Sequence, residues 1–386
     1  MTRASLREIA AYGSPVFAYM YTVGSVGFWL PLYARLNGFT YLQVQLLATV
    51  YFIVITPSTL IAGWLSDRSE RPGRIAFTGM LLNSLAVAMM PHIMKPLPLM
   101  GDRVIQALGL STAAPIAIGA LSLALGVSRG VGSGAFIMAS GMAIGSVAGG
   151  VLVEYLGFPA LFYSASIISL LAGVLALTTR FPRVPGDRNL LQALRRIPPS
   201  AWIVLLGLLA RNTLATGVYA ILAILFSQII GLTILETALA LSLNPIVQAF
   251  FSLVVSRKAE GRELPIYTLA LASTSIVFTL YYYAHSLAMV LVAQIAQGLV
   301  YSTISVSGNM YVIRRSPEEI RYTASSLYNF FFNLGWITGT LAAGAYMDKH
   351  GPTAWLRLAI ILLPLVGLAT YAAARLAAGR GAGLAR

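Results

Sequence analysis

The chain has 386 residues, of which 58% are hydrophobic and only 10% are charged. A soluble protein carries about 25% charged residues, so this composition excludes a soluble globular protein. The net charge of +14 does not indicate nucleic-acid binding, because the basic residues fall in short loops between long apolar segments.

Twelve apolar segments follow one another along the chain, and each is long enough to cross a lipid bilayer as a helix. We place them at residues 13–36, 41–65, 74–94, 97–126, 131–155, 159–180, 201–228, 233–256, 265–284, 287–311, 320–347 and 353–378. The sequence therefore predicts an all-α membrane protein with twelve transmembrane helices. Because twelve is an even number, both termini are expected on the same side of the membrane.

The basic residues are divided unequally between the two sets of loops. Twenty of the 26 lie in loops on the side of the termini, four lie on the opposite side, and two lie inside helices. Basic loops remain in the cytoplasm, so this asymmetry predicts a multi-pass protein of the cytoplasmic membrane with both termini cytoplasmic.

The loop between the second and third segments is short and charged. Arg68, Arg71 and Arg74 follow Asp67 at one-turn spacing, between two apolar segments that must run antiparallel. The stretch resembles the signature loop of the major facilitator superfamily (MFS) of transporters, G-x-L-a-D-R-x-G-R-[RK]. The matching positions are Gly63, Leu65, Asp67, Arg68 and Arg71, whereas Glu70 and Pro72 depart from the pattern.

This resemblance implies a secondary transporter that works by alternating access, with a small-molecule substrate, proton or sodium as coupling ion, and a monomeric state. No catalytic residue and no cofactor are expected. In the family the loop aspartate pairs with a nearby arginine and faces the start of the eleventh helix. If this family role applies here, Asp67 together with Arg68 or Arg71 would form a cytoplasmic gate against residues 318–324. Alternatively, these charges only fix the topology.

Residues 181–200 form the longest polar interruption and contain four prolines. They are either a short amphipathic helix on the membrane surface or a plain solvated linker. This cytoplasmic linker separates two predicted domains, a six-helix bundle over residues 1–180 and a second over residues 201–386. The halves repeat at an offset of about 190 residues, and such pseudo-symmetric bundles are the arrangement that the MFS resemblance implies.

Arg103 and Gln106 in the fourth segment resemble the R-x-x-Q-G-x-G motif of the family, although Ala107 replaces its first glycine. An arginine inside the membrane is costly and faces either protein or a water-filled cavity. Arg103 would therefore hold an anion or tune a nearby proton site. Alternatively, its side chain extends to the outer end of the helix, where Asp102 would be an interfacial carboxylate.

Arg211 and Asn212 lie near the middle of the seventh segment, where an arginine cannot easily reach the membrane surface. When the two halves are aligned at the repeat offset, Arg211 and Asn212 align with the region around Tyr21 in the first segment. The first and seventh helices line the cavity in the MFS, so we expect Arg211 to contact substrate. The alternative is a structural pairing with a neighbouring helix.

Two further sets of residues complete the predicted site. A stripe of small residues in the fifth segment indicates close helix packing. The stripe consists of Gly141, Gly145, Gly149 and Gly150. It resembles an exporter motif of the family, but that motif has proline at the position of Ser146. Polar residues of the tenth and eleventh segments would contact substrate or link helices. They include Gln294, Gln297, Asn329, Asn333 and Trp336.

The distribution of charges indicates the class of substrate. The acidic residues Asp102, Glu154, Glu236 and Asp348 all lie near outer helix ends, whereas two arginines lie inside helices. This favours a small organic anion over a cation. The histidines show no metal-ligand spacing, so no metal is expected. A proton-coupled exporter of drugs or hydrophobic compounds and a non-transporting membrane sensor or receptor remain the alternatives.

Overall fold

A computed structural model describes residues 6–125, 127–179, 181, 195–317 and 321–383. Within these ranges every regular element is a helix, and no strand occurs. The predicted all-α fold is therefore confirmed. The linker at residues 181–200, expected to be either a short amphipathic helix or a plain solvated linker, lies mostly outside the described residues.

Helices occupy all twelve predicted segments. The first six segments contain α1 (Leu6–Thr22), η1 (Val23–Gly27), α2 (Phe28–Leu36), α3 (Tyr41–Arg68), α4 (Pro72–Met89), η2 (Met90–His92), α5 (Pro96–Leu110), α6 (Ala113–Leu125), α7 (Val127–Leu156) and α8 (Phe158–Thr178). The last six contain α10 (Pro199–Tyr219), α11 (Leu222–Ile224), η3 (Leu225–Ile229), α12 (Ile234–Lys258), α13 (Glu263–Tyr283), α14 (Leu287–Arg315), α15 (Arg321–His350) and α16 (Pro352–Gly383).

Nine helices of the described part of the chain are, by their length and composition, long and apolar enough to cross a membrane. Three predicted segments are interrupted instead of forming one regular α-helix. The π-helix η1 interrupts the first between α1 and α2, and a turn at Ser111 and Thr112 separates α5 from α6. In the seventh segment, a turn at Ala220 and Ile221 separates α10 from α11. A π-turn leaves backbone groups outside the regular hydrogen-bond pattern, and such turns often occur at functional positions.

The chain packs as two compact units. Unit 1 comprises residues 1–187 together with 221–246, and unit 2 comprises residues 188–220 together with 247–386. Their boundaries fall just after the end of α10 and just after Pro245, which lies inside α12. The predicted domains at residues 1–180 and 201–386 stay a prediction.

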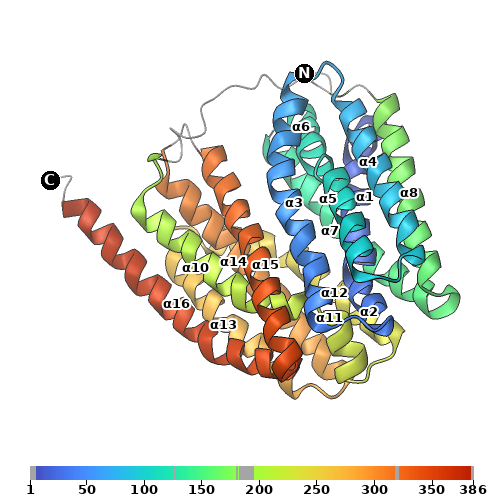
Figure 1. The fold of residues 1–386 in the computed structure, drawn as a ribbon. Helices are drawn as coiled ribbons and strands as arrows, with labels where there is room; N and C mark the ends of the chain where they lie inside the picture. The colour runs from blue at the N-terminus through green and yellow to red at the C-terminus, as the bar shows by residue number, and fades with distance from the viewer. Residues whose placement is uncertain (1–5, 126, 180, 182–194, 318–320, 384–386) are drawn as a thin grey trace. The chain divides into compact units, whose positions relative to one another are not determined.

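Within unit 1, α4 and α8 run side by side over most of their length, and α1 packs on α7 (Figure 1). A buried polar contact joins three of these helices. The side-chain amide of Asn83 on α4 donates to the hydroxyl of Ser169 on α8 at 2.6 Å and lies 3.4 Å from the hydroxyl of Thr22 on α1. Because lipid offers no hydrogen-bond partners, such contacts help to hold membrane helices together.

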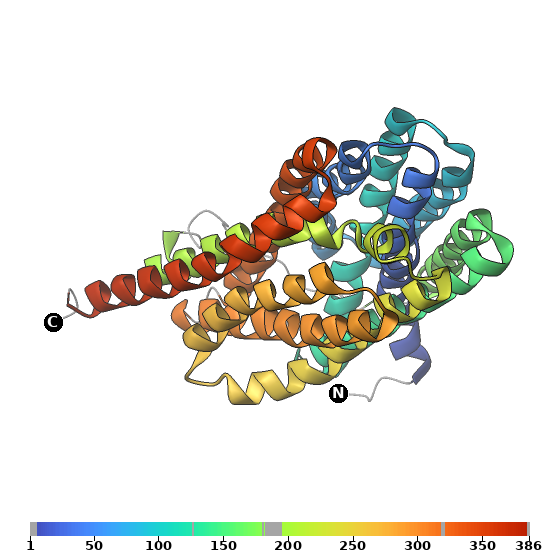
Figure 2. The ribbon, with the colours of Figure 1, turned by 90° about the horizontal axis from the view of Figure 1, so that it is seen from below.

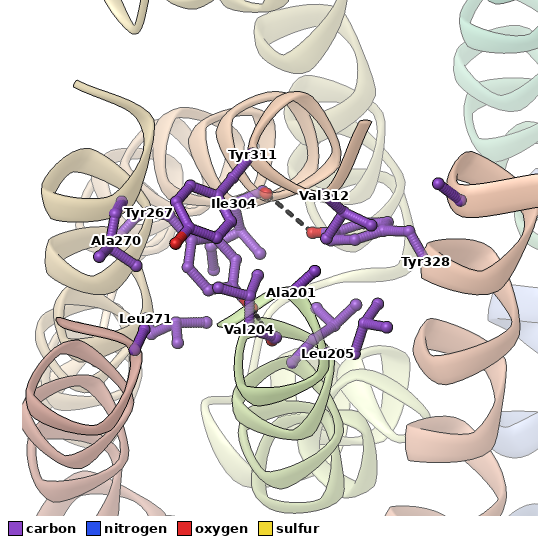
Figure 3. Packing of buried hydrophobic residues seen from close by; sticks show 14 of the residues in the cluster. Ala201, Val204, Leu205, Tyr267, Ala270, Leu271, Ile304, Tyr311, Val312 and Tyr328 are labelled. Atoms are coloured by element: carbon purple, nitrogen blue, oxygen red, sulfur yellow. Dashed lines mark hydrogen bonds between the residues drawn. The ribbon is translucent and has the colours of Figure 1, made fainter. Parts of the chain in front are cut away.

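Within unit 2, the long helix α16 lies alongside α10 and α13 (Figure 2). A buried cluster of α10, α13, α14 and α15 contains two tyrosines whose hydroxyls reach backbone carbonyls of other helices (Figure 3). Tyr267 donates to Val204 at 2.9 Å, and Tyr328 donates to Ile304 at 2.8 Å. These hydrogen bonds link α13 to α10, which carries the predicted substrate residue Arg211, and α15 to α14.

Candidate functional site

The first candidate site surrounds Arg103 on α5 in unit 1. The side chain is only 7% exposed, and its Nε donates to the carbonyl of Leu47 on α3 at 3.3 Å. Its Nη1 donates to Oε1 of Gln106, and its guanidinium lies 4.3 Å from the ring centre of Tyr51. Arg103 is thus directed into the unit, and not to the outer end of the helix.

Asp102, expected at the membrane interface, is buried beside Arg103 and is also only 7% exposed. Its Oδ2 has no hydrogen-bond partner among the described residues, and the same holds for Nε2 of Gln106 one turn further along α5. Leu99, Asp102 and Gln106 share the buried face of α5. The expected position of Asp102 at the membrane interface stays a prediction.

The second candidate site surrounds Arg211 on α10 in unit 2, which is 1% exposed. Its Nε donates to the hydroxyl of Thr274 on α13 at 3.2 Å, its Nη1 to Oδ1 of Asn212 at 2.9 Å and its Nη2 to the hydroxyl of Tyr219 at 2.7 Å. All three partners are neutral. In the described part of the chain, no carboxylate forms an ion pair with Arg211.

The neighbours of Arg211 attach α10 closely to α15. The side-chain amide of Asn212 donates to the backbone carbonyl of Phe332 at 3.1 Å. The hydroxyl of Thr216 donates to the backbone carbonyl of Gly335 at 3.1 Å. A Cβ atom added at Gly335 would lie 2.3 Å from Cβ of Asn212, so only glycine fits there. Arg211 therefore lies on a helix that packs closely against α15.

The other predicted substrate residues are scattered over both units. The hydroxyl of Tyr21 lies 3.2 Å from that of Ser164, and Gln297 accepts from the hydroxyl of Tyr281. Gln294 is completely buried, and within the described residues neither of its amide atoms has a hydrogen-bond partner. On α15, Asn329 is exposed, whereas Asn333 and Trp336 are partly buried.

The glycine stripe of α7 lies against the first segment and α12, within unit 1. A Cβ atom at Gly141 would lie 2.6 Å from the carbonyl oxygen of Phe17, and one at Gly145 would lie 2.3 Å from that of Tyr21. A Cβ atom at Gly149 would lie 2.9 Å from the Trp29 ring, and one at Gly150 would lie 2.1 Å from Cβ of Ala238. Close helix packing accounts for all four glycines.

The comparisons with known proteins decide the family. The model of the Major Facilitator Superfamily matches residues 16–259 and 203–380. The chain belongs to this superfamily. It is accordingly a transporter and not an enzyme.

Individual relatives are more distant. The riboflavin transporter RibZ of Clostridioides difficile (strain 630) is 27% identical over 139 residues, which cover 35% of this chain and only 29% of RibZ. The structure of the nucleoside transporter NupG has a TM-score of 0.77 at 13% identity and covers 95% of this chain and 98% of that chain. An inward-facing bacterial homologue of the human lysosomal transporter Spinster has a TM-score of 0.76 at 14% identity, with 96% of both chains covered. At such low identities, the two structures show the shared MFS fold alone.

The predicted MFS gate loop is shorter than the motif suggests, because α3 extends to Arg68 and α4 begins at Pro72. Arg71 is exposed between them. Gly63 lies within α3. The side chains of Asp67 and Arg68, and residues 318–320 opposite them in the prediction, lie outside the described part of the chain. The gate therefore stays a prediction.

The corresponding loop of the second half has a contact that the sequence did not reveal. Arg314 at the end of α14 donates to Glu260 at 2.5 Å and to Glu263 at 2.7 Å. Glu263 also accepts from the backbone N–H of Gly261 at 3.1 Å. Arg314 and Glu260 are 54 positions apart, so no local pattern could have paired them.

Proposed function

We propose that this MFS transporter moves a small organic anion across the cytoplasmic membrane by secondary active transport with alternating access. The observation that carries the proposal is the set of partners of Arg211. Its guanidinium is buried and bonded to two hydroxyls and one amide, so the described residues around it leave its positive charge uncompensated.

The energetic argument concerns the cost of this charge. Removing an ion from water costs several kcal/mol after relaxation, and a buried ion is usually paired with an opposite charge. Arginines inside membranes therefore mark substrate or ion pathways. An anionic solute would compensate the charge of Arg211 and accept two parallel N–H···O hydrogen bonds from its guanidinium. A cationic solute would be repelled.

The predicted gate belongs to the same proposal. Asp67, with Arg68 or Arg71, would close the cytoplasmic side when the binding residues face outward. The predicted binding residues are Arg103, Gln106, Arg211, Asn212, Tyr21, Gln294, Gln297, Asn329, Asn333 and Trp336. The protein would act as a monomer with both termini in the cytoplasm.

The test is a thermal-shift screen of the purified protein against organic anions, sugars and lipophilic cations, followed by transport in liposomes. We expect organic anions to stabilise the protein, and Arg211→Gln to weaken their binding about tenfold or more, because hydrogen bonds to charged groups contribute about 1.5–3 kcal/mol. Arg357→Gln is the matched control, since Arg357 is exposed on α16 and bonds Tyr282 at 2.7 Å. Unchanged anion affinity in Arg211→Gln would refute the proposal.

A second candidate is a neutral heteroaromatic solute, which the partial match to a riboflavin transporter favours. Riboflavin and nucleosides therefore belong in the same screen. Binding of these compounds with no dependence on Arg211 would replace the anion by this second class.

A further inference from the structure

The end of unit 2 that is predicted to face the cytoplasm carries a large surplus of positive charge. From residue 195 to the C-terminus, its loops and helix ends contain eleven basic and four acidic side chains, a surplus of seven. Both acids that the structure describes there, Glu260 and Glu263, bind Arg314. The other described bases of this end are exposed and form no ion pair with a described residue. They are Arg195, Arg196, Arg257, Lys258, Arg262, Arg315 and Arg375.

The end of α14 meets the start of α13 at this surface. Arg314 of α14 binds Glu263, the first residue of α13, at 2.7 Å, so Arg315 and Arg262 beside them lie at the same junction. The guanidinium of Arg315 lies 5.4 Å from the ring centre of Tyr311, one turn earlier in α14. Tyr311 belongs to the buried cluster of unit 2 (Figure 3). Arg315 is therefore anchored where the apolar interior ends.

The helix α16 brings a second arginine of this kind to the same level. A Cβ atom at Gly367 would lie 2.7 Å from the carbonyl oxygen of Thr268, five residues after the start of α13. Arg375 lies eight residues beyond Gly367, about 12 Å along a helix that runs antiparallel to α13. It thus reaches the level at which α13 begins. Its guanidinium lies 5.5 Å from the ring centre of Tyr371, which packs against the buried cluster.

The remaining arginines of this surface border the same cluster. Ile197 and Leu264 belong to the cluster. Arg195 and Arg196 directly precede Ile197, and Arg262 lies two residues before Leu264. The end of the apolar cluster is therefore bordered by exposed arginines, which we call the basic rim. The basic rim consists of Arg195, Arg196, Arg262, Arg315 and Arg375.

An apolar stripe leads away from the basic rim along α16. Large side chains at one-turn spacing are 57–67% exposed on this helix, although they are hydrophobic. They are Ile361, Leu365, Leu368 and Leu376. In a membrane protein such a stripe faces acyl chains. A molecule that carries a phosphate at one end and hydrocarbon at the other would therefore contact both the basic rim and the stripe.

The chemistry of the basic rim fits phosphate. All of its members are arginines, whose planar guanidinium donates two parallel hydrogen bonds to phosphate oxygens. Two of them, Arg315 and Arg375, lie over tyrosine rings, and tyrosine is enriched where helices leave the bilayer. Clusters of basic residues at this depth attract anionic lipids.

We propose that the basic rim binds the headgroup of an anionic phospholipid whose acyl chains lie along the exposed stripe of α16. The inference concerns unit 2 and does not depend on the transported solute. A bound headgroup would offset the mutual repulsion of the arginines. Because it binds the folded protein, it would also raise the stability of the chain by mass action.

The first experiment measures lipid binding to the purified full chain in detergent by native mass spectrometry. Phosphatidylglycerol, which carries one negative charge, should bind about tenfold or more tightly than phosphatidylcholine, which carries no net charge. Combining Arg315→Gln with Arg375→Gln should weaken the binding of phosphatidylglycerol about tenfold or more and leave that of phosphatidylcholine unchanged. Replacing both by lysine keeps the charge and should restore part of the affinity. The matched control combines Lys349→Gln with Arg357→Gln, which are exposed at the opposite ends of α15 and α16 and should retain the wild-type affinity.

The second experiment separates a lipid from a free anion. Phosphatidylglycerol should raise the temperature of thermal unfolding of the wild type, and inorganic phosphate at the same concentration should not. Equal affinities for the two lipids, or wild-type affinity in the glutamine variant of Arg315 and Arg375, would refute the site. An equal loss in the control would show that any exposed base suffices, and rim-dependent stabilisation by inorganic phosphate would show an anion site without a lipid. Either result overturns the proposal, whereas the proposed anion transport is tested only in the solute screen.

Discussion

Gly145 on α7 allows a quantitative test of the packing between α7 and α1. A Cβ atom at this position would lie 2.3 Å from the carbonyl oxygen of Tyr21 and 3.0 Å from its Cα. Both atoms belong to the backbone, so they can move only if the helices separate. Overpacking of this kind costs about 1–3 kcal/mol.

The matched control for Gly145→Ala is Gly101→Ala on α5. Gly101 is also inside a helix, but a Cβ atom there would meet nothing within 4 Å. Alanine favours helix over glycine by about 1 kcal/mol, and this gain applies to both variants. Gly101→Ala should therefore gain stability, whereas Gly145→Ala should lose most or all of that gain and fall below Gly101→Ala by about 1–3 kcal/mol.

The assay is thermal unfolding of the purified protein in detergent, followed by tryptophan fluorescence. Gly145→Ala should unfold at a lower temperature than Gly101→Ala, with the wild type as reference. Equal unfolding temperatures for the two variants would show that α7 and α1 are not held at this separation.

Two other contacts allow predictions of different size. Arg314→Gln removes an ion pair with the exposed Glu260 and one with Glu263, whose side chain is only 11% exposed. Thermal unfolding should reveal a loss of stability, and the share from the exposed pair should shrink in high salt. A loss that high salt leaves unchanged would contradict a screened ion pair. Asn83→Ala removes the buried bond to Ser169 and should cost about 0.5–1.5 kcal/mol in the same assay, since the Ser169 hydroxyl loses this donor but keeps its bond to the carbonyl of Ala165. An unfolding temperature equal to that of the wild type would show that this polar contact does not stabilise unit 1.

The sequence predicted the helices well, because a bilayer demands long apolar segments and their lengths can be counted directly. It did not predict the interruption by η1 at Val23–Gly27 or the end of α10 at Tyr219. Both interruptions lie within apolar runs, and hydropathy does not record how backbone hydrogen bonds are arranged. The turn between α5 and α6 was missed for the same reason.

Of the candidate site, the sequence identified the costly residues but not their partners. An arginine among apolar residues stands out, so Arg103 and Arg211 were named correctly as buried charges. Their partners Leu47, Tyr51 and Thr274 come from other helices, and pairing them requires the tertiary fold. The burial of Asp102 also follows from which face of α5 packs against other helices, and the sequence alone did not show that face.

The two halves have diverged in charge while retaining polar residues at equivalent positions. Arg103 bonds Gln106 in the first half, whereas Gln297 in the second half accepts from Tyr281. The buried charge of the second half lies on α10 instead, at Arg211. The hydrogen bonds of each arginine stay within a single unit, so a movement of the units as rigid bodies would break none of them.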